Sequence, residues 1–363
     1  MNRIVRILLF SAMVFGINNS LFAQLNNVED LLRGGVEDAN VLLKEYISPL
    51  GKGFGADLNN GWFTTARPHK FLGFDITITA NFAIAPEIDE TFDISKLTLN
   101  SVRLTNPTGD PNSPTIIGSD SPGPEITIFA KDPSSGNEII IGDFFMPEGI
   151  DFQYVPSPMI QAGLGIGFNT DVMARYLPQI EFDEDVGSLQ MIGFGLKHSF
   201  TRANEFGDPP PIDISIFAGY TTFQAQSKDI NLPPDPSAIP TGAAYDDQEI
   251  ELEANSFTAN LIISKSFPLL TLFGSVGYET SSMDLKLKGT YPITAIEDNI
   301  ASPNFGQKAI RDLVDPINIS IDGANALRGS AGLRLKLLFL AIHGSYTFAD
   351  YPVATAGLSF DLR

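Results

Sequence analysis

Residues 327–362 read LRGSAGLRLKLLFLAIHGSYTFADYPVATAGLSFDL, and they contain three segments of strict two-residue alternation with almost no connecting sequence. Side chains on a β-strand point alternately to opposite faces. In the first segment Leu333 and Leu335 alternate with Arg334 and Lys336, and the next two segments likewise separate apolar from small or polar side chains. The pattern predicts an antiparallel meander with one apolar and one polar surface.

The same alternation recurs through most of the chain, most clearly in residues 71–84. There Phe74, Ile76 and Ile78 alternate with Asp75 and Thr77. A water-soluble sandwich would carry Lys and Glu on its outer face, whereas this polar face is mainly Gly, Thr and Asn, as expected for a lumen behind a lipid-facing wall. We therefore predict an all-β fold, an antiparallel transmembrane β-barrel of about twelve strands, with a range of about ten to fourteen.

The predicted connections are of two kinds. Those near residues 169–170, 267–268 and 337–338 are tight, whereas residues 86–158, 227–248 and 290–326 form long connections rich in Pro and acidic residues. Outer-membrane barrels have short periplasmic turns and long external loops. We expect these three long segments to be external; for residues 86–158 the alternative is an external segment that contains one further pair of spanning strands.

The N-terminal region differs from the rest. Residues 1–23 have the form of a secretory signal peptide, with Arg3 and Arg6 before an apolar run and Ala23 at the cut; a membrane anchor is the alternative. Residues 27–47 are predicted to form an amphipathic helix that ends at Pro49 and Gly51. We expect residues 24–70 to form a helical and Gly-rich plug, and residues 71–363 to form the barrel.

Composition excludes several classes of function. The formal charge is −20, and loss of the two signal-peptide arginines makes it −22, so nucleic acid is not an expected partner. The chain has no cysteine, hence no disulfide and no thiolate chemistry. No cofactor is expected. A calcium site in the acidic external loops is conceivable, but the acidic residues show no regular ligand spacing, so we predict solvated loops and no metal site.

Six side chains on the predicted lumen face are the candidate substrate-binding residues: Arg175, Lys197, Arg328, Arg334, Lys336 and His343. Their positive bias would attract an anion and tune selectivity. The alternative is structural, since a barrel interior has to be filled by side chains. The sequence contains no recognisable nucleophile with a base that a third group orients, so we predict no catalytic residues and no enzyme. A hydrolase that uses His343 and Ser345 is the remote alternative.

Several short motifs resemble those of uncharacterised bacterial outer-membrane barrels, which are distantly similar to long-chain fatty-acid transporters. The motifs are residues 48–53 (SPLGKG), 59–63 (NNGWF), 171–178 (DVMARYLP), 217–221 (FAGYT) and 357–360 (GLSF). The resemblance covers most of the mature chain, but its likeness to the transporters is architectural, so no ligand residue carries over. It implies location in the outer membrane of a Gram-negative cell, contact with outer-membrane lipid and recognition of the last strand by barrel-insertion machinery.

These observations lead to two expectations for function. The first is passage of a small hydrophobic or amphipathic molecule across the outer membrane. The alternative is a structural or surface-interaction barrel that acts through its acidic external loops.

Overall fold

The computed structural model describes residues 28–131, 137–181, 187–201, 212–227, 232–296, 302–304 and 307–362. The predicted signal peptide lies outside these residues and stays a prediction. None of the described helices has the length and apolar character needed to cross a membrane.

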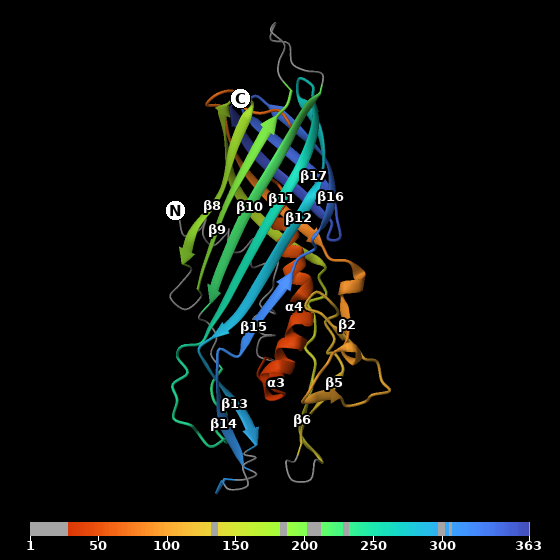
Figure 1. Ribbon diagram of the computed structural model, residues 1–363, viewed down its shortest axis with the longest axis vertical. Helices are drawn as coiled ribbons and strands as arrows, with labels where there is room; N and C mark the ends of the chain where they lie inside the picture. The colour runs from red at the N-terminus through yellow and green to blue at the C-terminus, as the bar shows by residue number, and fades with distance from the viewer. Residues whose placement is uncertain are drawn as a thin grey trace.

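Ten antiparallel strands close into a barrel (Figure 1). Each strand pairs with the next, β11 pairs with β12, and β1 closes the ring by pairing with β18 from Phe74↔Leu362 to Ala83↔Val353. The strands are β1 (Phe74–Ile84), β7 (Tyr154–Gly167), β8 (Thr170–Glu181), β9 (Ser188–Ser199), β10 (Asp213–Ser227), β11 (Glu249–Ser266), β12 (Leu270–Lys288), β16 (Ala326–Leu337), β17 (Leu340–Phe348) and β18 (Val353–Leu362).

The two faces of the wall follow the sequence alternation. On β1, Ile76 and Ile78 are exposed on the outside, whereas Thr77, Thr79 and Asn81 are buried inside. An apolar outer belt around a polar interior is the arrangement of a transmembrane β-barrel. The predicted fold class is confirmed, with the strand number at the lower end of the predicted range.

The two ends of the barrel have different connections. At one end β7–β8 and β16–β17 turn through single pairs of residues, and Phe168, Asn169 and Leu338 adopt positive φ there. We assign this end, which lies at the top of Figure 1 together with the C-terminus, to the periplasm, because periplasmic turns are the short ones. The opposite end carries the long connections, and by the same assignment we call it the extracellular end.

The extracellular end carries small sheets rather than further spanning strands. In residues 86–153, β3 (Val102–Leu104), β5 (Glu125–Lys131) and β6 (Glu138–Phe145) form one sheet, and β2 (Thr91–Asp93) pairs with β4 (Asn112–Pro114). The 3-10 turns η2 (Glu87–Asp89) and η3 (Ile94–Lys96) lie between them. The first long connection is predicted to extend to residue 158, but β7 already begins at Tyr154, so the connection is shorter than predicted. The predicted alternative of a further pair of spanning strands within it is wrong. In the third long connection β13 (Thr290–Ile296) pairs with β14 (Lys308–Val314), and β15 (Ile317–Asp322) extends the sheet beside β12.

The helical region is longer than predicted. It consists of α3 (Val28–Arg33) and α4 (Val36–Leu58), and α4 continues through Pro49 and Gly51 instead of ending there. The reason is tertiary packing, because glycine removes the Cβ atoms that would collide with the walls. A Cβ on Gly51 would lie 2.8 Å from Met283, and one on Gly53 would lie 2.7 Å from Val155, on the other side of the barrel mouth.

The N-terminal half of α4 lies in an apolar core outside the barrel wall. Leu42, Leu43 and Tyr46 are buried there between the residue 86–153 module and the extracellular extension of β12 to β15 (Figure 1). The module contributes Ile94, Val102, Ile116, Ile126, Ile128 and Met146, and the other side contributes Leu285, Leu287, Tyr291, Ile317 and Ile319. The helix is thus the centre of an extracellular domain, and its second half enters the barrel.

Two isoleucines of equal exposure test the membrane assignment. Ile78 on the barrel wall is 56% exposed, and Ile139 on extracellular β6 is 55% exposed. We expect Ile78→Arg to destabilise the inserted barrel by about 2–4 kcal/mol, as for arginine at a bilayer midplane, and the control Ile139→Arg to have little effect. Heat-modifiable gel migration and urea unfolding in lipid vesicles measure both. Equal tolerance of the two arginines would contradict a lipid-facing wall.

A second test concerns the helix inside the barrel mouth. A Cβ on Gly55 would lie 2.1 Å from Ser281 Oγ on β12. We expect Gly55→Ala to lower the unfolding midpoint although alanine is the better helix former, since overpacking costs about 1–3 kcal/mol. The double variant Gly55→Ala with Ser281→Gly should regain most of the loss. A stabilising Gly55→Ala would show that the helix is not held against this wall.

Candidate functional site: the barrel lumen

Residues 59–70 run through the barrel interior from the end of α4 to the start of β1. Their side chains Asn59, Asn60, Trp62, Thr65 and His69 are buried, although this segment contains no strand. A buried main chain without secondary structure needs other hydrogen-bond partners. Those partners are side chains of the barrel wall.

At the extracellular side of the lumen, Arg175 of β8 caps the C-terminal end of α4. Its Nη1 donates to the Leu58 carbonyl at 2.6 Å, and its Nη2 donates to the Asn60 carbonyl. The last carbonyls of a helix lack helical donors and carry partial negative charge, so a buried cation there satisfies both needs. The guanidinium carbon also lies 3.7 Å from the centre of the Trp62 ring, within cation–π range.

Arg328 of β16 binds the next residues of the segment. Its Nη1 donates to the Asn59 carbonyl at 3.0 Å and to Glu279 Oε2 at 2.8 Å, and its Nη2 donates to Asn60 Oδ1. Thr347 of β17 donates to the same Asn60 oxygen at 2.7 Å. Asn59 Nδ2 also donates to the Thr280 carbonyl of β12 at 3.2 Å, so together with Arg175 of β8 four strands contact the Asn59-Asn60 pair.

An aromatic cluster occupies the middle of the lumen. Trp62 lies 5.4 Å from Phe217 between ring centres, and Phe63 lies 5.5 Å from the same ring. The Trp62 ring fits because Gly195 and Gly219 leave room; a Cβ on either glycine would approach that ring to about 3 Å. Gln161 Nε2 holds the Trp62 carbonyl at 2.9 Å.

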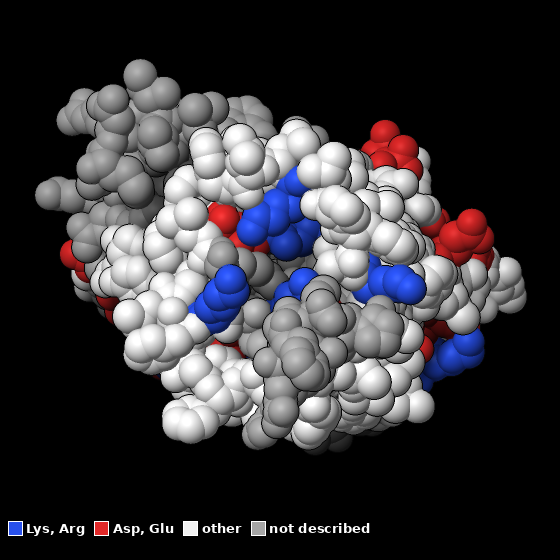
Figure 2. Space-filling model, turned by 90° about the horizontal axis from the view of Figure 1, so that it is seen from above, with Lys and Arg blue, Asp and Glu red and all other residues white. Residues whose placement is uncertain are grey.

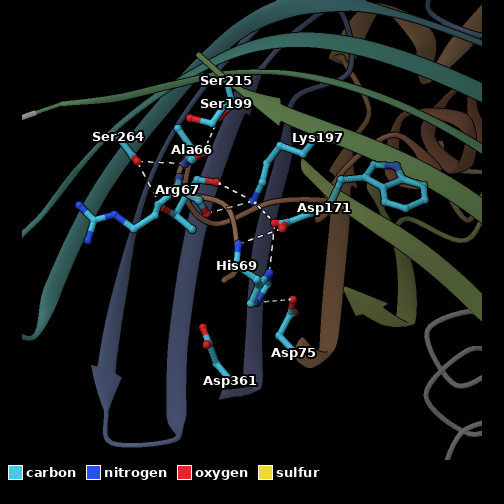
Figure 3. Close-up of polar contacts among 12 residues, drawn as sticks. Ala66, Arg67, His69, Asp75, Asp171, Lys197, Ser199, Ser215, Ser264 and Asp361 are labelled. Carbon is cyan, nitrogen blue, oxygen red and sulfur yellow. Dashed lines mark hydrogen bonds and ion pairs between the residues drawn. The ribbon is translucent and has the colours of Figure 1, made fainter. Parts of the chain in front are cut away.

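The segment is bound most densely near the periplasmic end (Figure 3). Ser264 Oγ accepts from the Ala66 N–H at 2.9 Å, and Ser215 Oγ donates to the Ala66 carbonyl. Lys197 Nζ reaches the Thr65 and Arg67 carbonyls at 3.4 and 3.3 Å and pairs with Asp171 at 3.0 Å.

His69 is the last residue held in this way. Asp171 accepts from the His69 N–H at 2.9 Å, and its other oxygen lies 3.1 Å from His69 Nδ1. On the opposite side of the ring, Nε2 lies 3.2 Å from Asp75 Oδ1 at the start of β1. The imidazole is thus clamped between carboxylates of two strands.

The structure divides the six candidate residues into two groups. Arg175, Lys197 and Arg328 contact the N-terminal segment as described above. Arg334 and Lys336 instead pair with Asp361 of β18, Lys336 at 3.1 Å, and His343 lies beside them with neither ring nitrogen hydrogen-bonded within the described part of the chain. All six are on the lumen side of the wall, but they do not converge on one point.

Viewed from the periplasmic end, Lys and Arg side chains surround a hollow in the barrel mouth (Figure 2). Partly or fully exposed cations at this end include Arg67, Lys70 and Lys336. The periplasmic mouth is therefore locally basic in a chain of formal charge −20.

The acidic residues of the extracellular connections stabilise turns. Asp110 accepts from the Asn112 N–H, and Asp247 from the Thr290 N–H. Hydrogen bonds from Ser237, together with Lys308, lower the pKa of Asp235 to about 2. Across the described ranges, no three His, Cys, Asp or Glu side chains are grouped so that they would hold a metal ion.

The sequence did not reveal the partners of Arg175 and Lys197. Asp171 shares its parity with Met173 and Arg175, so the alternation places it in the lumen, but nothing in the pattern joins it to His69. The main-chain carbonyls that Arg175 and Lys197 bind have no sequence signature at all.

The whole arrangement, a closed barrel threaded by its own N-terminal segment, defines a plugged transmembrane β-barrel. The chain belongs to a family of unknown function (DUF6588), whose model matches residues 1–362. No curated protein matches it.

Solved structures similar to the chain include several outer-membrane proteins. Ail, the attachment invasion locus protein of Yersinia pestis, is 9% identical over 81% of this chain and 99% of its own, with a TM-score of 0.23. The translocator domain of the autotransporter NalP from Neisseria meningitidis is 9% identical over 81% and 90%, with a TM-score of 0.27. The outer membrane protease OmpT from Escherichia coli is 7% identical over 82% and 100%, with a TM-score of 0.28. Identities and TM-scores this low say nothing about a ligand, an activity or a partner of this chain.

A substitution at Asp171 tests the periplasmic clamp. Asp171→Asn removes the carboxylate charge from the buried Lys197–Asp171 pair, and removing one partner of a buried ion pair costs about 3–5 kcal/mol. Asp213→Asn is the matched control, because its partner Arg67 is partly exposed and the loss should be about 1 kcal/mol or less. Unfolding midpoints in urea, read by gel migration, give both values. Equal losses would contradict the clamp.

Proposed function

We propose that the protein is an outer-membrane barrel whose lumen serves as a socket for an extracellular domain, and that this domain carries the function by binding a partner at the cell surface. The observation that carries the proposal is the path of the chain. Helices α3 and α4 are central to the extracellular core, and the residues that follow directly, 59–70, are bound along the lumen.

Specific hydrogen bonds tie α4 to both extracellular modules. The Asp38 carboxylate accepts from the N–H groups of Asn100, Ser101 and Val102 at 2.7 to 3.2 Å. On the other side Asn40 donates to the Pro316 carbonyl at 3.1 Å and accepts from the Asn318 N–H at 3.0 Å. The domain is thus joined to the lumen segment through one helix.

The charge of the chain indicates the kind of partner. With a formal charge of −20, the protein attracts a partner with basic groups and repels acidic surfaces. Interaction through the acidic extracellular connections therefore favours a basic partner.

Passage of a small hydrophobic or amphipathic molecule is the second candidate, and the composition of α4 favours it. Its second half contains Pro49, Gly51, Gly53 and Gly55. Proline and glycine are about 3 and about 1 kcal/mol worse than alanine inside a helix. This half is therefore held by packing against β7 and β12 rather than by helix propensity, and it would unwind if these strands released it.

A disulfide lock distinguishes the two candidates. Thr65 Oγ1 in the segment and Ser264 Oγ on β11 lie 3.2 Å apart, and the chain has no natural cysteine. The double variant Thr65→Cys with Ser264→Cys would join the segment to the wall under oxidising conditions, and Thr65→Cys alone is the control. Solute flux is measured in liposomes with and without reductant.

We expect the native protein and the locked variant to show no flux, because the segment fills the lumen. Flux that the oxidised lock abolishes and reductant restores would replace our proposal with gated passage. Flux that the lock leaves unchanged would contradict a closed lumen and both candidates.

A further inference from the structure

A groove of about 550 Å³ lies on the outer wall of the barrel across β9 to β12. Its floor includes Ala218 and Ala259, which face each other across β10 and β11. Leu196 on β9 and Tyr278 on β12 flank this pair in the same row of the sheet. Ligand pockets in proteins are concave, mostly apolar and about 300–1,000 Å³ in volume, so the groove has the size of a site for one extended apolar molecule.

The surroundings of the groove are the lipid-facing belt. Leu196, Ile216, Leu261 and Val276 line it, and each of these side chains is exposed on the outside of the wall. The medium in contact with this belt is hydrocarbon. An apolar groove continuous with that belt is therefore open to the acyl chains of the membrane.

A two-fold interface pairs one part of a patch with another part of the same patch, so a second copy of the chain would have to insert side chains of this wall into the groove. A flexible acyl chain can fill a groove whose floor is two methyl groups and whose walls are branched or aromatic side chains.

One side of the groove is polar. His198 lines it close to the periplasmic end of β9, and its Nδ1 lies 2.9 Å from Thr170 Oγ1. Thr170 Oγ1 donates its hydrogen to the Phe168 carbonyl at 3.1 Å, so His198 Nδ1–H is the donor to Thr170. The other ring nitrogen, Nε2, is then an acceptor for an N–H of an amine headgroup at the level of the periplasmic leaflet. This placement gives the bound molecule a direction, with its polar end toward the periplasm.

We propose that this groove binds one acyl chain of a phospholipid from the periplasmic leaflet, with its headgroup beside His198. The site lies outside the lumen and is independent of the function proposed above.

The single tryptophan of the chain reports on this site. Phe217 lines the groove and contacts Trp62 on the lumen side, so a heavy atom on a bound acyl chain would lie one layer of strand from Trp62 and quench it at short range without touching it. The protein is reconstituted into vesicles of phosphatidylcholine with brominated acyl chains, and into unbrominated vesicles as reference. We expect quenching in the native protein and loss of most of it in Ala218→Phe and Ala259→Phe, which fill the groove.

The control is Ala356→Phe on β18, which is opposite Ala80 in a like pair of lipid-facing alanines and does not line the groove. It should leave quenching unchanged, and heat-modifiable migration shows that each variant is folded. Absent quenching in the native protein, or equal quenching after groove filling, would overturn the site. A cross-linked dimer that Ala218→Phe abolishes would replace the lipid by a second copy of the chain.

Discussion

Burial of polar groups inside a closed lumen is the constraint on which this structure depends. The wall presents cations and hydroxyls to an interior that has little water contact, and an unpaired buried polar group costs about 1–3 kcal/mol. Residues 58–67 present the complementary groups, because seven main-chain carbonyls, those of Leu58, Asn59, Asn60, Trp62, Thr65, Ala66 and Arg67, accept from wall side chains. The segment therefore supplies hydrogen-bond acceptors to the barrel wall, and the wall supplies donors to the segment, so each depends on the other for these bonds.

Helix α4 joins this interior to the extracellular domain. Its first half is a conventional amphipathic helix whose leucines are buried by external strands. Its second half contains Gly51, Gly53 and Gly55, and because these residues have no side chain, β12 and β7 can approach the helix on two sides. The difference in composition along one helix follows from the space available, which is wide outside the barrel and limited by the wall inside it.

The fold could be predicted from the sequence to a large extent, and the site only in part. Alternation determines which side chains face lipid and which face the lumen, because a strand has a period of two regardless of its neighbours. That rule placed Arg175, Lys197 and Arg328 correctly on the lumen face. It could not show that their partners are main-chain atoms, since every residue carries a carbonyl and only the path of the chain selects those that are used.

The end of α4 illustrates the same limit. Pro49 and Gly51 are helix-breaking signals, and local propensity alone ends the helix there. The structure continues it to Leu58, where Arg175 and Arg328 bind the carbonyls that follow. The helix thus ends where the buried cations of the wall are available to replace helical donors, a position set by strands more than a hundred residues away in the sequence. Removing the segment from the lumen would take from Arg175 the two carbonyls that it binds and leave Arg328 with Glu279 and Thr347 as partners, so water would have to replace the lost acceptors. These contacts therefore stabilise the threaded arrangement on which our proposal of an anchored domain rests.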